Sequence, residues 1–180
     1  MAFDLLLQRE TDSDWAMDRP AALQLDFTPT ERKTLKLLEP STAAHAVDVV
    51  SWARGHGIPA RLSHTAIYTP EDVEMFYKKG ASIIQPGRLS WHSVGRAYHL
   101  VINLPNGELD KDAYRRVGQY ARSQGGDWLG DKPFKNVKGQ TIYDTAHFEY
   151  HPGTDIATYR KSELAAREFK QAQRRARIYT

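Results

Sequence analysis

Two histidines lie seven residues apart, and a third follows a carboxylate further along the chain. His92 and His99 flank Gly95, and His147 follows Asp144 by three residues. Imidazole nitrogens bind zinc, and a carboxylate beside a metal-bound water can take its proton. Glycine allows a loop to turn sharply, so both rings of the first pair can face one point. These residues are therefore candidates for metal-assisted hydrolysis.

Other interpretations of the histidines remain open at this stage. A single histidine lies at a surface or at the edge of a core more often than in a metal site. The chain has no cysteine, so only histidines and carboxylates remain as metal ligands, and thiol nucleophiles are excluded. Residues three apart on a strand point to opposite sides, so Asp144 reaches the surroundings of His147 only if the strand bends or bulges between them.

The segments that must position these groups alternate between helices and strands. Thr69, Pro70 and two acidic residues predict a helix over 70–79 that ends at Gly80. Three strands are expected, over 58–62, 98–104 and 141–150. Further helices are expected after Thr28-Pro29 and over 41–55, 110–123 and 155–177. This order lacks a regular βαβ repeat, so it predicts an α+β fold with a small mixed or antiparallel sheet flanked by helices.

The wider pattern around the histidines resembles a known family. Ser-x-His-x-x-Gly-x-Ala-x-His over 90–99, followed by Asp-x-x-His-Phe-Glu over 144–149, is similar to the signature of the zinc D-alanyl-D-alanine carboxypeptidases and dipeptidases and of phage L-alanyl-D-glutamate endopeptidases. Residues 68–82 also resemble this family's helix before the first ligand, and residues 121–128 resemble its helix end and Gly/Trp turn. The resemblance covers residues 58–151 and implies the fold of the hedgehog and D-Ala-D-Ala peptidase group.

The resemblance also implies roles for individual residues. It makes His92 and His147 zinc ligands, Asp144 the general base, and Ser90 a residue that holds substrate or the first ligand loop. Tyr68 and Trp128 are expected at the substrate cleft, although a place in the core is an equal alternative for the tryptophan.

Two further polar residues, Glu149 and His151, follow His147 closely in the sequence. Glu149 is expected to orient a ligand imidazole by a hydrogen bond to the ring nitrogen that does not bind the metal, or else to form a structural ion pair. His151 is a back-up ligand or a turn residue.

Two positions depart from the family's pattern. His99 stands where the family has an aspartate ligand. Three histidines and a water also form a catalytic zinc set, with one negative charge fewer beside the ion. The alternative is a site that has lost its metal. Tyr68 stands where the family usually has an arginine that reads the substrate's carboxylate. This change favours an endopeptidase over a D,D-carboxypeptidase, with Arg61, Arg88 or Arg96 as substitutes for the missing charge.

The remaining predictions concern organisation and partners. Residues 1–40 are expected to form an N-terminal arm, 41–154 the catalytic core and 155–180 a basic C-terminal helix. That helix either has a solvated face or attaches to an anionic surface, which a net charge of +3 also suits. No stretch approaches the ~20 apolar residues that span a bilayer, and the N-terminus has no signal-peptide pattern.

The sequence therefore predicts a zinc peptidase that cuts peptidoglycan stem peptides. We expect it to be made in the cytoplasm and to act on the wall after holin-type release or injection. No nucleic-acid partner is expected, and the sequence favours no particular oligomeric state. The alternative function is a metal-free cell-wall-binding or phage structural protein derived from this fold.

Overall fold

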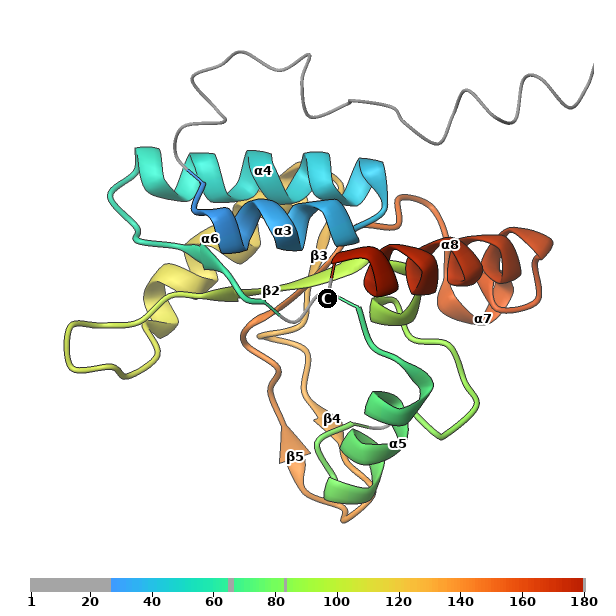
Figure 1. Ribbon diagram of the computed structural model, residues 1–180. Coiled ribbons are helices and arrows are strands. Elements are labelled where there is room, and N and C mark those ends of the chain that lie inside the picture. The colour runs from blue at the N-terminus through green and yellow to red at the C-terminus, as the bar shows by residue number, and fades with distance from the viewer. Residues whose placement is uncertain (1–26, 65–66, 83, 180) are drawn as a thin grey trace, which may run out of the picture.

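The computed structural model describes residues 27–64, 67–82 and 84–179 (Figure 1). The helices are α3 (Pro29–Leu37), α4 (Pro40–Gly55), α5 (Pro70–Lys79), α6 (Lys111–Ser123), α7 (Ile156–Tyr159) and α8 (Glu163–Tyr179), with a 3-10 turn, η1 (His92–Val94). The strands are β1 (Arg61–Leu62), β2 (Ala97–Val101), β3 (Asp127–Trp128), β4 (Phe134–Lys135), β5 (Thr141–Ile142) and β6 (His147–Glu149). Most of the predicted N-terminal arm, residues 1–26, lies outside the described residues.

A four-stranded antiparallel sheet forms the centre of the molecule, in the order β1-β2-β6-β3. Successive side chains on a strand point to opposite faces, so the sheet has two different surfaces. Tyr98, Leu100 and Phe148 belong to the buried core together with apolar residues of α4 and α6. The alternate positions, including His99 and His147, lie on the other face. The predicted α+β class with a small antiparallel sheet is confirmed.

The helices and a second small sheet cover the two faces unequally. Figure 1 shows α3 and α4 together above the sheet, while α5 and the β4–β5 hairpin project below it as a separate lobe. Helix α5 begins as predicted, because the Thr69 side chain accepts a hydrogen bond from the Asp72 backbone and Asp72 caps Thr69 in return. The Asn136 side chain in the hairpin donates to the carbonyl of Gly80, which ties the two parts of the lobe together.

The predicted strand over 141–150 is wrong in one respect, because the structure divides it in two. Its first part, β5, pairs with β4 in the lobe, and its second part, β6, pairs with β2 and β3 in the central sheet. Residues 143–146 leave both sheets, and the indole N–H of Trp128 donates to the carbonyl of Thr145 at 2.8 Å. The chain therefore bends between Asp144 and His147.

Three other predicted boundaries also differ from the structure. The strand expected over 58–62 is limited to β1, and the one over 98–104 to β2. The helix expected over 155–177 consists of α7 and α8, because the chain turns at Arg160–Ser162. The Ser162 hydroxyl accepts a hydrogen bond from the backbone amide of Ala165 in the first turn of α8.

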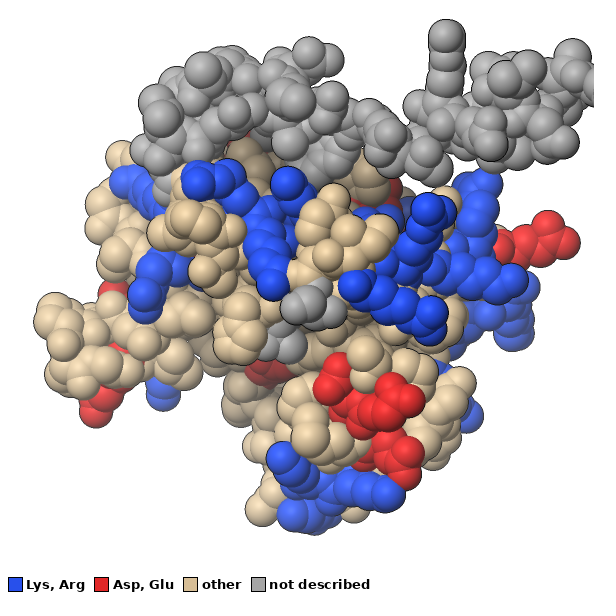
Figure 2. Space-filling model, in the orientation of Figure 1, with Lys and Arg blue, Asp and Glu red and all other residues tan. Residues whose placement is uncertain are grey.

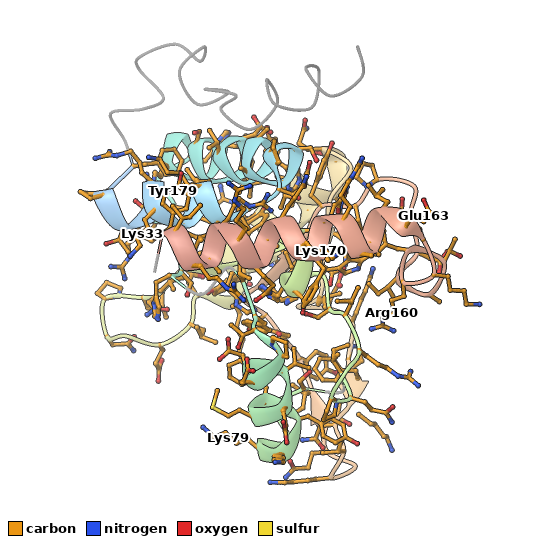
Figure 3. The ribbon with its side chains drawn as sticks, turned by 45° about the vertical axis from the view of Figure 1, so that its right-hand side comes forward. Lys33, Lys79, Arg160, Glu163, Lys170 and Tyr179 are labelled. Carbon is orange, nitrogen blue, oxygen red and sulfur yellow. The ribbon has the colours of Figure 1, made fainter. Side chains whose placement is uncertain are left out.

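Helix α8 packs against the rest of the fold through its small and acidic residues. Ala165, Glu168 and Ala172 are buried, and Glu168 accepts two hydrogen bonds from the Arg96 guanidinium at 2.7 and 2.8 Å. Arg175 donates to the carbonyl of Leu37 at the end of α3. Figure 3 shows α8 running alongside the first helices, between the labelled Glu163 and Tyr179. The last helix thus supports the loop that follows His92.

The exposed side of α8 and α3 is strongly basic. Lysines and arginines gather over these two helices, while acidic residues gather on α5 below them (Figure 2). The exposed cations of these two helices are Arg32, Lys33, Lys36, Arg167, Lys170, Arg174 and Arg177. No described helix combines the length and the apolar composition needed to cross a membrane. The predicted attachment of this surface to an anionic partner remains a prediction.

Candidate active site

The turn that carries His92 is held from several sides. The Ser90 hydroxyl accepts a hydrogen bond from the backbone amide of Ser93 at 3.1 Å, and the Ser93 hydroxyl accepts from the amide of Ser90 at 3.4 Å. Gly95 closes the turn with a φ of +76°, and a Cβ there would lie 2.9 Å from the backbone nitrogen of Glu39. Only glycine fits this position. Ser90 therefore stabilises the turn that carries His92.

The sheet register brings the other two histidines together. His99 on β2 lies directly opposite His147 on β6, on the same face of the sheet. His92 approaches from its turn, with its Nε2 atom 3.3 Å from Nδ1 of His147. One nitrogen from each of the three rings lies within 4.8 Å of the others. His92 and His147 are buried and His99 is partly buried, so the cluster is at the bottom of a depression rather than on the open surface.

The three imidazoles could hold a metal ion, and the spacing of one pair of nitrogens suits zinc. Two imidazole nitrogens that bind zinc at about 2.0–2.1 Å in tetrahedral geometry lie about 3.3 Å apart, and the His92–His147 separation in the structure is also 3.3 Å. The opposite ring nitrogen of His147, Nε2, lies 2.8 Å from Glu149 Oε1. A proton on Nε2 that is donated to this carboxylate leaves the Nδ1 lone pair facing the other two rings, as metal binding requires.

Asp144 lies beside the cluster because of the bend in the chain. Its Oδ2 atom is 3.8 Å from Nε2 of His99 and 3.7 Å from Nδ1 of His147. Burial alone would raise the pKa of Asp144, but the neighbouring imidazoles of His99 and His147 outweigh this and lower that pKa below its ordinary value. The carboxylate is thus ionised at neutral pH and can accept a proton.

Glu149 connects the cluster to a fourth histidine. Burial would raise the pKa of Glu149, but the hydrogen bonds from His147 and His151 lower that pKa to about 2. His151 Nε2 is 2.9 Å from Glu149 Oε2, and its other nitrogen is 2.9 Å from the carbonyl of Thr154. Both nitrogens of His151 are directed away from the three-histidine cluster, so the structure does not support a back-up ligand role. The ring stacks on Trp91 instead, at 4.2 Å.

A cavity of about 590 Å³ opens over the cluster. The sheet face and the histidines form one wall, and Val73, Phe76 and Phe134 from the lobe line the other side. Tyr68 also lines this cavity and stacks on His92 with the ring centres 4.2 Å apart. Burial and the charge of Asp144 raise the pKa of the Tyr68 hydroxyl well above its usual range. The hydroxyl therefore keeps its proton and can donate a hydrogen bond.

Trp128 is not among the described residues that line the cavity, so its predicted place at the substrate cleft is wrong and the alternative, a place in the core, is correct. It is buried in the core, where only 4% of its surface is exposed. A Cβ at Gly118 or Gly130 would come within 2.2 Å of its ring, so these two glycines make room for the indole. Through its bond to Thr145, Trp128 holds the bend beside Asp144. It is a positioning residue for the site.

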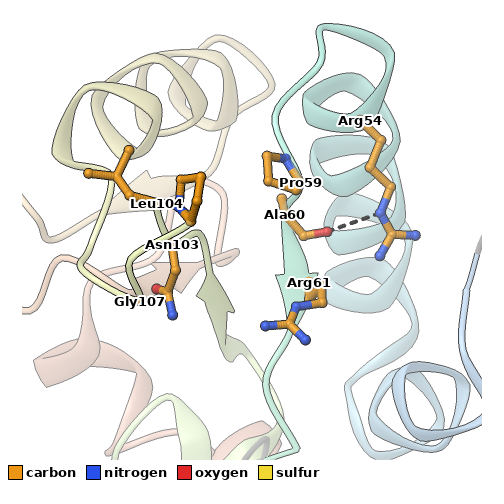
Figure 4. A pocket seen from close by; sticks show the side chains of 8 residues that line it. Arg54, Pro59, Ala60, Arg61, Asn103, Leu104 and Gly107 are labelled. Atoms are coloured by element: carbon orange, nitrogen blue, oxygen red, sulfur yellow. Dashed lines mark hydrogen bonds between the residues drawn. The ribbon is translucent and has the colours of Figure 1, made fainter.

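The arginine at the cavity is not one of those suggested by the sequence. Arg96 pairs with Glu168 against α8. Arg61 lines a different hollow between β1 and the loop after β2, shown in Figure 4, whose described lining residues include no histidine or carboxylate. Arg88 is exposed and is absent from the described lining of the cavity. Arg160, at the end of α7, does line it. The only sequence signal for Arg160 was its place in a basic segment.

The remaining histidines lie outside the cluster. His45 is buried in the core, where the Tyr98 hydroxyl is 3.1 Å from one ring nitrogen and the carbonyl of Ala121 is 3.2 Å from the other. His56 is exposed and stacks on Trp52. His64 lines a groove beside α8. Among the described residues, the group that could hold a metal ion contains none of these three histidines.

Two solved structures that resemble this chain are described as peptidases. The L-Ala D-Glu endopeptidase ChiX of Serratia marcescens superposes with a TM-score of 0.53 and 18% identity, over 69% of this chain and 89% of ChiX. The L,D-carboxypeptidase DacB of Streptococcus pneumoniae matches with a TM-score of 0.43 and 19% identity, over 76% of this chain and 79% of DacB. No family model and no curated protein matches the sequence. The predicted resemblance to this group of peptidases is confirmed at the level of the fold.

Proposed function

We propose that this protein is a zinc-dependent peptidase that hydrolyses a peptide bond in the stem peptides of bacterial peptidoglycan. The observation that carries the proposal is the three-histidine cluster, with one nitrogen of each ring within 4.8 Å of the others, beside an ionised carboxylate at the bottom of a cavity. The fold shared with an L-Ala D-Glu endopeptidase supports the same reaction class. Acting on the cell wall requires that the protein leave the cytoplasm, and we propose release through a holin-type pore or injection.

Six of the side chains that line the cavity have a proposed role in this reaction. His92, His99 and His147 would hold the ion, and Glu149 would fix the ring of His147. A zinc ion held there would supply a Lewis acid for the substrate carbonyl and would make a bound water more acidic. Asp144 accepts the proton of the attacking water and then donates it to the amine of the leaving peptide. The Tyr68 hydroxyl, which remains protonated, can donate to a carbonyl of the bound substrate.

We favour an endopeptidase over a D,D-carboxypeptidase. The residue at position 68 is a tyrosine, which stacks on His92 and carries no charge for a terminal carboxylate. The cavity also lies between the sheet and the lobe, with lining residues from both. A cavity of this kind can contact an extended peptide from two sides. Peptides that end in D-Ala-D-Ala and peptides with an internal L-Ala-D-Glu bond distinguish the two activities.

The deciding experiment uses purified protein of the full sequence. We expect about one zinc per chain by elemental analysis, and cleavage of an L-Ala-D-Glu-containing stem peptide that is followed by mass spectrometry. A chelator should abolish cleavage, and added zinc should restore it. A protein that binds no metal and cuts neither peptide, yet binds cell-wall fragments, would instead be a metal-free wall-binding descendant of the fold. Full activity in a metal-free protein would overturn the metal mechanism.

A further inference from the structure

The cavity contains one permanently cationic side chain. Among the described residues that line it, Arg160 is the only lysine or arginine. It comes from the segment between α7 and α8, which lies outside the part of the chain with the peptidase motifs. Figure 3 shows the Arg160 side chain below α8, on the side of the lobe formed by α5. It therefore provides positive charge at the rim of the candidate active site.

The direction of the Arg160 guanidinium is fixed by the backbone. Its Nε and Nη2 atoms both donate to the carbonyl of Leu89, at 2.9 and 2.6 Å. Leu89 directly precedes Ser90, so this contact ties Arg160 to the loop that leads to His92. A guanidinium has five N–H groups, and two of them are used in this contact, which leaves about three for other acceptors. The Arg160 guanidinium is thus fixed in position and still has N–H donors for a ligand.

Arg160 has no carboxylate partner among the ion pairs of the described residues. Three of the four other partly buried arginines have such a partner: Arg54 pairs with Glu31, Arg96 with Glu168 and Arg122 with Asp131, whereas Arg175 donates to a backbone carbonyl. Burial and the neighbouring Arg88 lower the pKa of Arg160. A partly buried cation beside a second cation is costly, so an anion that binds there relieves both the desolvation and the repulsion.

We propose that Arg160 binds a free carboxylate of the peptide substrate and selects peptides that carry one. This inference rests on the proposed peptidase function and identifies the chemistry of its substrate. Arginine suits the task because its planar N–H groups match the two oxygens of a carboxylate. Since Ser90 and Trp91 also line the cavity on the way to His92, the carboxylate lies beside the scissile bond rather than on it. The α-carboxylate of a D-Glu residue that is linked through its side chain has this character.

The test compares two stem peptides that differ in a single group. One contains D-Glu with a free α-carboxylate, and the other contains the corresponding amide, D-isoglutamine. We expect the parent protein to cleave the acid peptide with the higher kcat/KM. Arg160→Ala should lower kcat/KM for the acid peptide by about 10- to 100-fold, mainly through KM, because a hydrogen bond to a charged group is lost. It should leave the amide peptide nearly unchanged.

Two further variants separate charge from structure. Arg160→Gln keeps an N–H donor for the Leu89 carbonyl and removes the charge, so it should lose the preference for the acid while its melting temperature stays near that of the parent. Arg88→Ala removes an exposed neighbouring cation of the same type and should leave the preference intact. The proposal would be overturned if Arg160→Gln lowered kcat/KM equally for the acid and the amide peptide. It would also be overturned if Arg88→Ala reduced the preference for the acid peptide as much as Arg160→Gln does.

A binding measurement keeps the two proposals distinguishable. Calorimetric titration of the acid and amide peptides does not depend on turnover. If the protein cuts neither peptide but binds the acid form more tightly through Arg160, the peptidase proposal fails and the Arg160 proposal stands. If it cuts both peptides equally and binds them equally, the Arg160 proposal fails and the peptidase proposal stands.

Discussion

Replacing Asp144 by asparagine tests the proposed chemistry directly. Asparagine has nearly the same size and keeps the place of the side chain 3.7–3.8 Å from the nitrogens of His147 and His99, but it cannot accept a proton. Loss of a general base typically costs about 100- to 10,000-fold in rate, which corresponds to about 3–5 kcal/mol of activation free energy. We expect kcat to fall within this range. The three histidines are unchanged, so zinc should remain bound.

The assay measures turnover of the stem peptide and zinc content on the same sample, at saturating zinc. Asp112→Asn is a matched control, because the Asp112 side chain is 80% exposed in the first turn of α6 and is not among the described residues that line the cavity. This control should behave like the parent protein. The side chain of Asp144 is itself only 36% exposed, so the melting temperature must be compared as well, to exclude a general loss of structure.

Two results would contradict the role given to Asp144. Activity near that of the parent would mean that another residue is the base, and Glu149 on β6 is the next carboxylate along the chain. Loss of zinc with the fold intact would make Asp144 a ligand, and one of the three histidines would then have a different function. A fall in kcat with zinc retained is the single outcome that fits proton transfer.

Three further predictions follow from the described contacts. His99→Asp should keep zinc, because a carboxylate binds zinc at a similar distance; failure to load the variant while the parent loads would show that His99 is not a ligand. Glu168→Ala should lower the free energy of unfolding by about 3–5 kcal/mol in urea titrations, since it leaves the partly buried Arg96 without its carboxylate; a change below about 1 kcal/mol would contradict this. Burial would raise the pKa of Glu31, but hydrogen bonds from Thr28 and Leu62 and the charge of Arg54 lower that pKa below its ordinary value. The ionised Glu31 therefore stabilises the folded protein above the pKa that this residue has in the unfolded chain, and this contribution is lost as the pH falls through the folded pKa. Glu31→Gln should therefore be less stable than the parent at pH 7 and approach it in acid; an equal difference at both pH values would refute this.

The parts of the site that could be predicted are those encoded locally. Gly95 between two histidines indicated a tight turn, and its positive φ and close approach to Glu39 bear this out. The capping pattern at Thr69 likewise fixed the start of α5. In these cases the residues that decide the conformation are neighbours in sequence, so the pattern carries the information.

The parts that were missed depend on residues far apart in the chain. The bend at Asp144 requires Trp128, whose ring position in turn requires small residues at Gly118 and Gly130. Arg160 reaches the cavity through a carbonyl 71 residues away. Long-range pairing of this kind leaves no periodicity or spacing in the sequence, so neither feature could be read from local patterns.

The docking of α8 has a consequence for the order in which the molecule assembles. Glu168 supports the loop after His92 from 72 residues away, and Arg175 closes a contact with Leu37 over 138 residues. Closing such long loops is slow, and chains fold more slowly as their contacts become more distant in sequence. During synthesis, the segment with all three cluster histidines emerges before the helix that supports the turn of His92. The proposed binding of a metal should therefore become possible late in refolding, at the same rate at which α8 docks, and not with the earlier formation of the helices.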